Sequence, residues 1–151
     1  MSKEVHDEVI GLMSQDVMGD WCFDFESSLF SRILNVTIEA NDESDNRPRK
    51  NQYEAYCWLK ENEDKLKELL QSSIYQQYQN NLAEIRSSWG PEAEENAPIL
   101  SDSAEIWVLL SKPDICLLSE YADICVHLET KWDPEHGVTV LIENGTVKRV
   151  E

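Results

Sequence analysis

The sequence is poor in the residues from which phosphate-binding loops and common catalytic motifs are built. Its 151 residues include only five glycines and three histidines. It contains no Walker loop, no dinucleotide-binding glycine motif and no nucleophile elbow, and each of these motifs needs glycines at fixed positions between a strand and a helix. We therefore expect no cofactor and assign no catalytic residue, and we favour a binding protein over an enzyme.

Long hydrophobic runs are also missing. The longest, residues 106–110, has five apolar residues, whereas a membrane span needs about 20. Acidic side chains already occur in residues 1–7 and no long apolar segment follows them, which argues against a secretory signal peptide. The sequence therefore predicts a cytoplasmic protein with no membrane-bound part.

Cysteine occurs four times, without the spacing of a metal site. Cys22, Cys57, Cys116 and Cys125 form no Cys-x-x-Cys motif and no paired cysteine and histidine pattern. Each is flanked by apolar residues, which is typical of buried thiols in a reducing compartment. We expect four buried, reduced cysteines; a zinc site is the less favoured alternative.

Basic residues are scarce relative to acidic ones. Thirteen lysines and arginines stand against 30 aspartates and glutamates, which gives a formal net charge of −17 and a pI of about 4.4. The acidic excess lies in residues 1–46 and 92–151, whereas residues 47–91 are nearly balanced. Such a distribution repels nucleic acid and anionic membranes and accelerates encounter with a basic partner. Solubility alone is the other explanation for a strong negative charge.

Large side chains are present in sufficient number for a hydrophobic core, and the first third of the chain has the pattern of β-strands. Apolar and polar residues alternate in residues 21–26 and again in residues 34–39, as they do in half-buried strands. Residues 9–13 predict a weaker first strand. Residues 41–50 are polar, contain a proline and predict a loop.

The middle of the chain has helical periodicity. Residues 51–61 predict one helix, and Asn62 is placed to cap a second, which ends at Gly90-Pro91. The pattern leaves open whether residues 51–88 form one long helix or two. Residues 92–98 predict an acidic, mobile linker. Residues 101–110 predict a short helix with a capping box between Asp102 and Glu105, and Lys112-Pro113 is expected to end it.

The last third returns to strands, at residues 115–118, 124–132, 138–142 and 146–150. Asn144-Gly145 predicts a two-residue hairpin turn, because both residues tolerate the positive φ of a type I′ turn. The turn pairs Glu143 with Thr146 and Ile142 with Val147. We therefore expect one α+β domain over residues 1–151, with a largely antiparallel sheet from the N- and C-terminal strands and two to three helices from the middle packed on it. The strand order stays open.

Two motifs resemble a family of small bacterial domains of unknown function. One lies in the predicted helices, and the other is a polar corner before the terminal hairpin; the early Gly19-Asp20-Trp21 also fits. The residues are Gln52-x-x-Ala55-Tyr56-x-x-Leu59, Glu61-Asn62-Glu63 and Trp132-Asp133-Pro134-Glu135-His136-Gly137. The resemblance spans roughly residues 9 to 150 and implies an α+β fold. Some similar domains are found beside toxins and look like immunity proteins, so the resemblance implies such a role as one candidate for this chain.

The corner at Trp132, Asp133, Glu135, His136 and Gly137 has three interpretations. As a structural corner, Asp133 would close a turn, Gly137 would adopt a conformation closed to other residues, and His136 would bond a backbone carbonyl. As a surface, it would recognise a partner. As a metal or hydrolytic site, Asp133, Glu135 and His136 would act together, with His127 as a possible fourth group. We favour the structural interpretation, since neighbouring side chains of an extended segment point to opposite sides.

The function that the sequence favours is an acidic protein-binding module, namely an immunity-type inhibitor that occludes a basic, nuclease-like toxin domain. We expect a monomer or weak dimer that binds neither nucleic acid nor membranes. A housekeeping protein and, less favoured, a metal-dependent hydrolase are the alternatives. The expected partner-binding residues are acids of predicted loops or helix starts, namely Asp42, Glu43, Asp45, Glu92, Glu94, Glu95 and Asp102.

Overall fold

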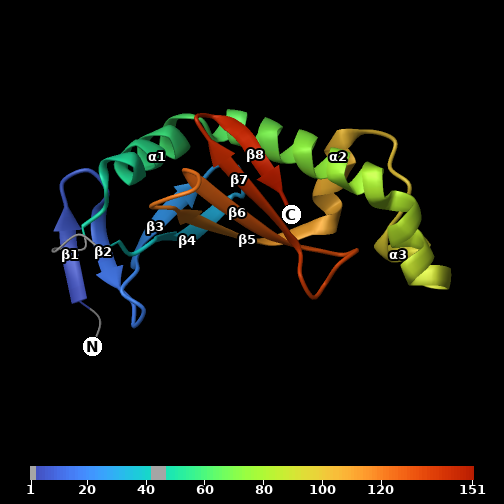
Figure 1. Ribbon diagram of the computed structural model, residues 1–151, viewed down its shortest axis with the longest axis horizontal. Coiled ribbons are helices and arrows are strands. Elements are labelled where there is room, and N and C mark those ends of the chain that lie inside the picture. Colours follow the sequence, from blue (N-terminus) through green and yellow to red (C-terminus); the bar gives the residue numbers. More distant parts are fainter. Residues whose placement is uncertain (1–2, 42–46) are drawn as a thin grey trace.

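The computed structural model describes residues 3–41 and 47–151. Within these residues, eight strands form a single sheet in which the strand order follows the chain order (Figure 1). All neighbouring strands are antiparallel except the fourth and fifth, which are parallel. The strands are β1 (Lys3–Asp7), β2 (Gly11–Gln15), β3 (Trp21–Ser27), β4 (Arg32–Ile38), β5 (Leu110–Leu117), β6 (Ile124–Thr130), β7 (Val138–Glu143) and β8 (Thr146–Val150).

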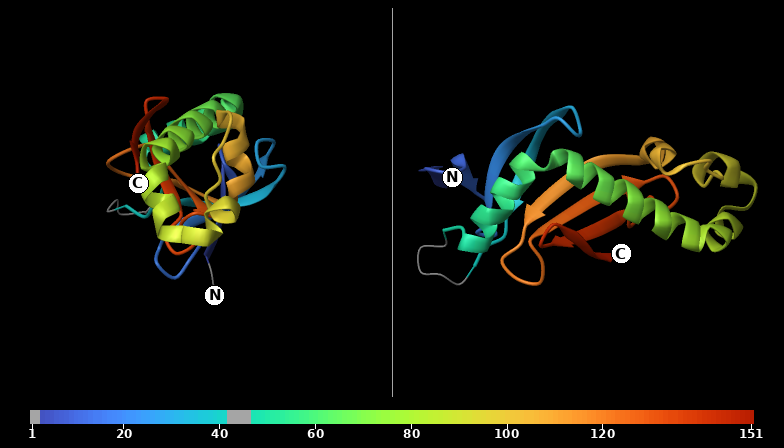
Figure 2. Two further views of the ribbon diagram at one scale, coloured as in Figure 1. Left: turned by 90° about the vertical axis from the view of Figure 1, so that its right-hand side faces the viewer. Right: turned by 90° about the horizontal axis from the view of Figure 1, so that it is seen from above.

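The helices come from the segment between β4 and β5, and the expected α+β fold is confirmed. Two long helices run one after the other along one face of the sheet (Figures 1 and 2). Their break lies at Asn62, so residues 51–88 belong to two helices and not to one. The elements are α1 (Lys50–Glu61), α2 (Glu63–Trp89), the 3₁₀ turn η1 (Gly90–Glu92), α3 (Ala93–Asn96) and the 3₁₀ helix η2 (Ser103–Leu109).

The junction between the long helices differs in one detail from the expectation. Asn62 occupies the N-cap position of α2, but its side chain accepts no hydrogen bond from that helix. Instead, both its backbone N–H (2.9 Å) and its side-chain Nδ2 (3.0 Å) donate to the carbonyl oxygen of Trp58. Asn62 therefore terminates α1 more than it caps α2.

The core lies between the sheet and the two long helices. On β3, β6 and β7 alternate side chains are buried, as the alternation predicts, and they face the buried stripe of the helices. A half-buried strand face against an amphipathic helix removes apolar surface from water on both elements, which is the main stabilising contribution. The helical stripe consists of Leu59, Leu66, Leu70, Ile74 and Tyr78, all of them fully buried.

The N-terminal strand prediction was wrong in its bounds. Residues 8–10 form a turn between β1 and β2, so the expected strand at 9–13 is replaced by two strands. The Asp7 carboxylate accepts the backbone N–H groups of Val9 (2.8 Å) and Ile10 (3.0 Å) and a hydrogen bond from the Tyr53 hydroxyl (2.5 Å). Burial alone raises the pKa of Asp7, but these hydrogen bonds and the charge of Arg47 outweigh it, so its pKa lies below the ordinary value.

The region around Pro113 also differs from the prediction. The capping box of Asp102 and Glu105 is present, but the helix it opens is a 3₁₀ helix. Pro113, expected after the end of the helix, lies inside β5. The register with β6 shifts between Ser111 and Asp114, and Lys112 has φ +49°. A proline without an N–H is tolerated in a strand at such a bulge.

The acidic segment 92–98 contains regular structure rather than a linker alone. Its first residues complete η1 and form α3, one turn of helix. Arg86 on α2 holds this turn, since its Nη1 donates to the carbonyl oxygen of Ala97 (2.6 Å) and its Nη2 contacts the Glu94 carboxylate. The backbone of this segment is therefore fixed against the end of α2.

The cysteines are less uniform than expected. Cys57 is exposed, because it follows the buried Tyr56 on α1 and points away from the sheet. Cys22, Cys116 and Cys125 are half-buried and free. Burial raises the pKa of Cys116 to about 12 and also raises that of Cys125, with neighbouring acidic groups adding to both shifts. These thiols are therefore poor nucleophiles.

Among the described residues, no helix combines the length and the hydrophobicity that crossing a membrane requires.

Candidate functional site

Residues 132–137, called the corner from here on, form a compact turn between β6 and β7. The N–H of Gly137 donates to the carbonyl oxygen of Asp133 (2.8 Å). The hydroxyl of Thr130 donates to the same carbonyl oxygen (3.2 Å) and accepts the N–H of Asp133 (3.1 Å). The Asp133 carboxylate accepts the N–H of His136 (3.2 Å). The backbone of the corner is thus held by its own polar groups.

Gly137 is the position where the corner passes closest to the sheet. Its φ is +67°, and a Cβ there would lie 2.3 Å from the carbonyl oxygen of Leu128 and 3.0 Å from the ring of His127. Every other L-residue would therefore meet both an unfavourable backbone conformation and a backbone clash. This explains a glycine at the end of the motif.

The histidines near the corner lie in two different environments. His136 is 77% exposed, and its Nδ1 lies 3.1 Å from the Asp133 carboxylate, whereas we expected it to bond a backbone carbonyl. His127 is half-buried, with Nδ1 3.0 Å from the Thr139 hydroxyl. Within residues 3–41 and 47–151, no three histidine, cysteine, aspartate or glutamate side chains are grouped as metal ligands.

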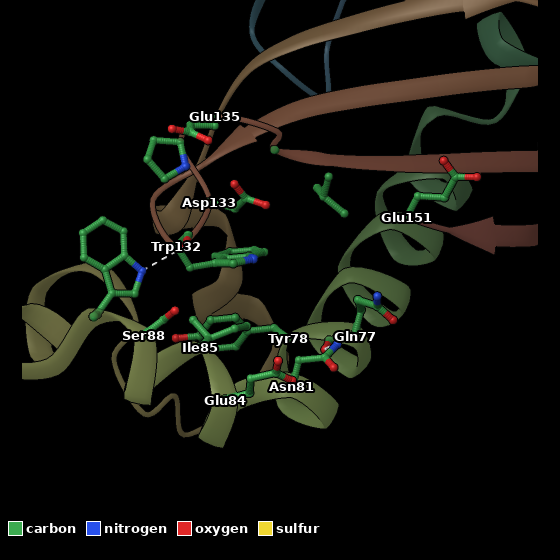
Figure 3. A pocket seen from close by; sticks show the side chains of 14 residues that line it. Gln77, Tyr78, Asn81, Glu84, Ile85, Ser88, Trp132, Asp133, Glu135 and Glu151 are labelled. Carbon is green, nitrogen blue, oxygen red and sulfur yellow. Dashed lines mark hydrogen bonds between the residues drawn. The ribbon is translucent and has the colours of Figure 1, made fainter.

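A cleft of about 640 Å³ separates the corner from the second half of α2 (Figure 3). One wall is α2, with Gln77, Asn81, Glu84 and Ser88. The opposite wall is the corner, and Glu151 lies at one side. We call this the α2–corner cleft.

The floor of the cleft is aromatic and firmly attached to both walls. The rings of Tyr78 and Trp132 pack with centroids 4.7 Å apart. The indole N–H of Trp89 donates to the backbone carbonyl of Trp132 (3.0 Å), which ties the corner to α2 (Figure 3). The Tyr78 hydroxyl donates to the carbonyl oxygen of Pro98 (2.6 Å), and burial raises its pKa to about 12, so it remains a donor at neutral pH.

The charge of the cleft is entirely negative. Glu84 on α2 and Glu135 on the corner are exposed, and neither carboxylate has a hydrogen bond or ion pair within the described part of the chain. Asp133 contacts His136, and Glu151 pairs with Arg149 (2.8 Å). No lysine or arginine is among the described residues that line the cleft. Low-dielectric walls of one charge concentrate the electrostatic potential in such a cleft.

The expected partner-binding acids are not equivalent in the structure. Glu92 and Glu95 lie directly after Trp89 and are exposed, with carboxylates that have no partner among the described residues. Glu94 is engaged by Arg86, and Asp102 accepts the N–H of Ala104 (2.9 Å) as the cap of η2.

The other three expected acids, Asp42, Glu43 and Asp45, lie outside the described residues.

Sequence reasoning missed the α2 wall of the cleft. Its polar residues, Gln77, Asn81, Glu84 and Ser88, recur at the spacing of a helix face, directly beside the apolar stripe. This second stripe was visible in the sequence. Only the fold shows that it faces the corner, some 50 residues further along the chain.

The chain belongs to the family described as Domain of unknown function (DUF6985). The family model matches residues 9–151, which include the corner and every residue that lines the cleft. The expected membership in a family of unknown function is therefore confirmed. No curated protein and no solved structure matches the chain.

Proposed function

We propose that the protein is an acidic protein-binding module that binds and occludes a basic protein domain, in the manner of an immunity-type inhibitor of a toxin. The observation that carries this proposal is the α2–corner cleft, in which the carboxylates of Glu84 and Glu135 lie beside an aromatic floor and pair with no lysine or arginine of the described residues. Tyrosine and tryptophan are favoured at the centre of protein interfaces, and charges at the rim steer association.

The overall charge supports a basic partner. A net charge of −17 attracts a basic domain over a distance set by the ionic strength, about 10 Å at 0.1 M salt. Glu92 and Glu95 extend the negative surface from the end of α2 beyond Trp89. The expected complex therefore forms fast at low salt and more slowly as salt is added, because screening acts mainly on the association rate.

The test compares two double charge reversals. Glu84→Lys combined with Glu135→Lys changes both walls of the cleft. Asp64→Lys combined with Glu68→Lys makes the same charge change on α2 at exposed positions that do not line the cleft and have no ion pair with another described residue. The wild-type protein and each variant are used to capture partners from the native host at low salt. We expect the wild type and the control, but not the cleft variant, to retain a basic protein that high salt releases.

Two outcomes would contradict the proposal. If both variants lose the captured protein equally, recognition is a diffuse charge effect and the cleft is not the binding site. If the captured protein does not impair growth when expressed alone, or impairs it equally in the presence of this chain, the chain binds its partner without acting as an inhibitor.

A further inference from the structure

We propose that the α2–corner cleft holds an arginine side chain of the partner, with the guanidinium against the accessible part of the aromatic floor and in the negative potential of Glu84 and Glu135. The inference rests on the proposed function, since it places the arginine on the basic partner. It adds a side-chain preference that net charge alone does not give.

The aromatic floor favours a guanidinium over an ammonium. Trp132 and Trp89 are only half-buried, so part of each is accessible, and Tyr78 packs against the ring of Trp132. A guanidinium is planar, weakly hydrated and stacks on aromatic faces. A lysine ammonium is a compact, strongly hydrated charge that gives up more hydration when it enters such a cleft.

The polar walls offer acceptors on opposite sides of the cleft. Glu84 and Glu135 contribute carboxylates from opposite walls (Figure 3). Asn81 donates its Nδ2 to the backbone carbonyl of Gln77 (2.9 Å), which leaves its Oδ1 as a further acceptor. An arginine has five N–H donors in a fixed fork and no acceptor, so acceptors on two sides satisfy it better than they satisfy a single ammonium.

The volume of the cleft is large enough for a side chain. A volume of about 640 Å³ is within the range of sites that enclose a small ligand. The hydrogen bond from Trp89 to Trp132 and the internal bonds of the corner fix both walls before binding. A preformed site loses little conformational freedom on binding, which strengthens selection by shape.

The experiment compares two probes of equal charge, an acetylated tetra-arginine amide and an acetylated tetra-lysine amide, by calorimetric titration at 0.15 M salt. We expect the arginine peptide to bind at least about tenfold more tightly than the lysine peptide. In nitrogen-labelled protein, we expect the arginine peptide to shift the indole N–H signals of Trp89 and Trp132 more than those of the other three tryptophans.

The variants are charge-matched. Glu84→Gln with Glu135→Gln should abolish the arginine preference, while Asp64→Asn with Glu68→Gln, which removes the same charge outside the cleft lining, should retain it. All four positions are exposed, so thermal melting should show that both variants stay folded.

Equal affinity for the two peptides, or no measurable binding of either, would overturn the arginine assignment. So would an equal loss of preference in the control variant. The proposed function fails separately: if capture of the basic partner depends on the cleft but survives replacement of the partner's arginines by lysines, the inhibitor proposal stands and only the arginine inference is wrong.

Discussion

At the scale of single residues, Gly137 gives the most direct test of how the corner is built. We expect Gly137→Ala to destabilise the protein by about 2 kcal/mol or more, because a positive φ is unfavourable for alanine and the new Cβ would lie 2.3 Å from the carbonyl oxygen of Leu128. Urea denaturation measures the loss in the free energy of unfolding.

Gly11→Ala is the matched control. Gly11 also has a positive φ, +97°, but nothing lies within 4 Å of a Cβ built there. The control should therefore show the backbone effect alone, and the difference between the two variants should measure the clash. Equal losses in both would mean that the close approach at Leu128 contributes nothing.

Single residues also show where the sequence was a sufficient guide. The pairing of Glu143 with Thr146 and of Ile142 with Val147 was predicted and is confirmed, because the two-residue turn at Asn144-Gly145 fixes the register locally. The side chain of Asn62 could not be placed in the same way. The Asn62 side chain can either bond to the Trp58 carbonyl at the end of α1 or cap the start of α2. Which of the two bonds forms depends on how both helices pack.

At the scale of elements, strands with a buried face or a clear turn signal could be predicted, as β8 was from the turn at Asn144-Gly145, and the polar β1 could not. The β3, β6 and β7 strands show clear alternation, because one side of each faces the helices. β1 is mostly exposed and polar, so its residues give no periodic signal. In β5, Pro113 was interpreted as the end of the preceding helix, and its place inside a strand was missed. The bulge that accommodates this proline depends on the pairing of β5 with β6, which the local sequence does not show.

The link between α2 and the corner is the contact on which the candidate site depends. We expect Trp89→Phe to remove the hydrogen bond to the carbonyl of Trp132, to cost about 1 kcal/mol of stability and to accelerate amide hydrogen exchange in the corner. The sequence could not predict this contact, because it joins residues 43 positions apart.

Trp107→Phe is the control for that change. The indole N–H of Trp107 donates to Gln71 Oε1 (2.8 Å), so this variant also removes one indole hydrogen bond to α2, but at η2. It should lower stability by a similar amount and leave hydrogen exchange in the corner unchanged. Faster exchange in both variants would indicate general loosening and contradict a specific role for Trp89.

At the scale of the whole molecule, the sheet and helices bring separate acidic segments to one end. The corner and the end of α2 come from different thirds of the chain, and Glu92 and Glu95 extend the negative surface beyond Trp89. Composition predicted the sign of this charge but not its location. This arrangement depends on how α2 packs on the sheet. The periodicity of the sequence identifies the apolar face of the helix but does not give the direction in which the helix lies across the strands.

The same charge has a consequence for stability that can be measured without a partner. With 30 acidic against 13 basic side chains, like charges repel within the folded molecule, and salt screens that repulsion. We expect the melting temperature at pH 7 to rise by roughly 3 °C or more between 10 and 300 mM NaCl, which for this chain length corresponds to about 1 kcal/mol.

The control is the same titration at pH 4.4, the pI, where the net charge is near zero and screening has little repulsion to relieve. There the melting temperature should change little or fall with salt, because salt then weakens favourable ion pairs such as that of Glu143 with Lys148. If salt raises it equally at both pH values, the stabilisation is a general effect of the ions. The negative charges would then not destabilise the folded protein, and the acidic surface would need no binding role to offset a loss of stability.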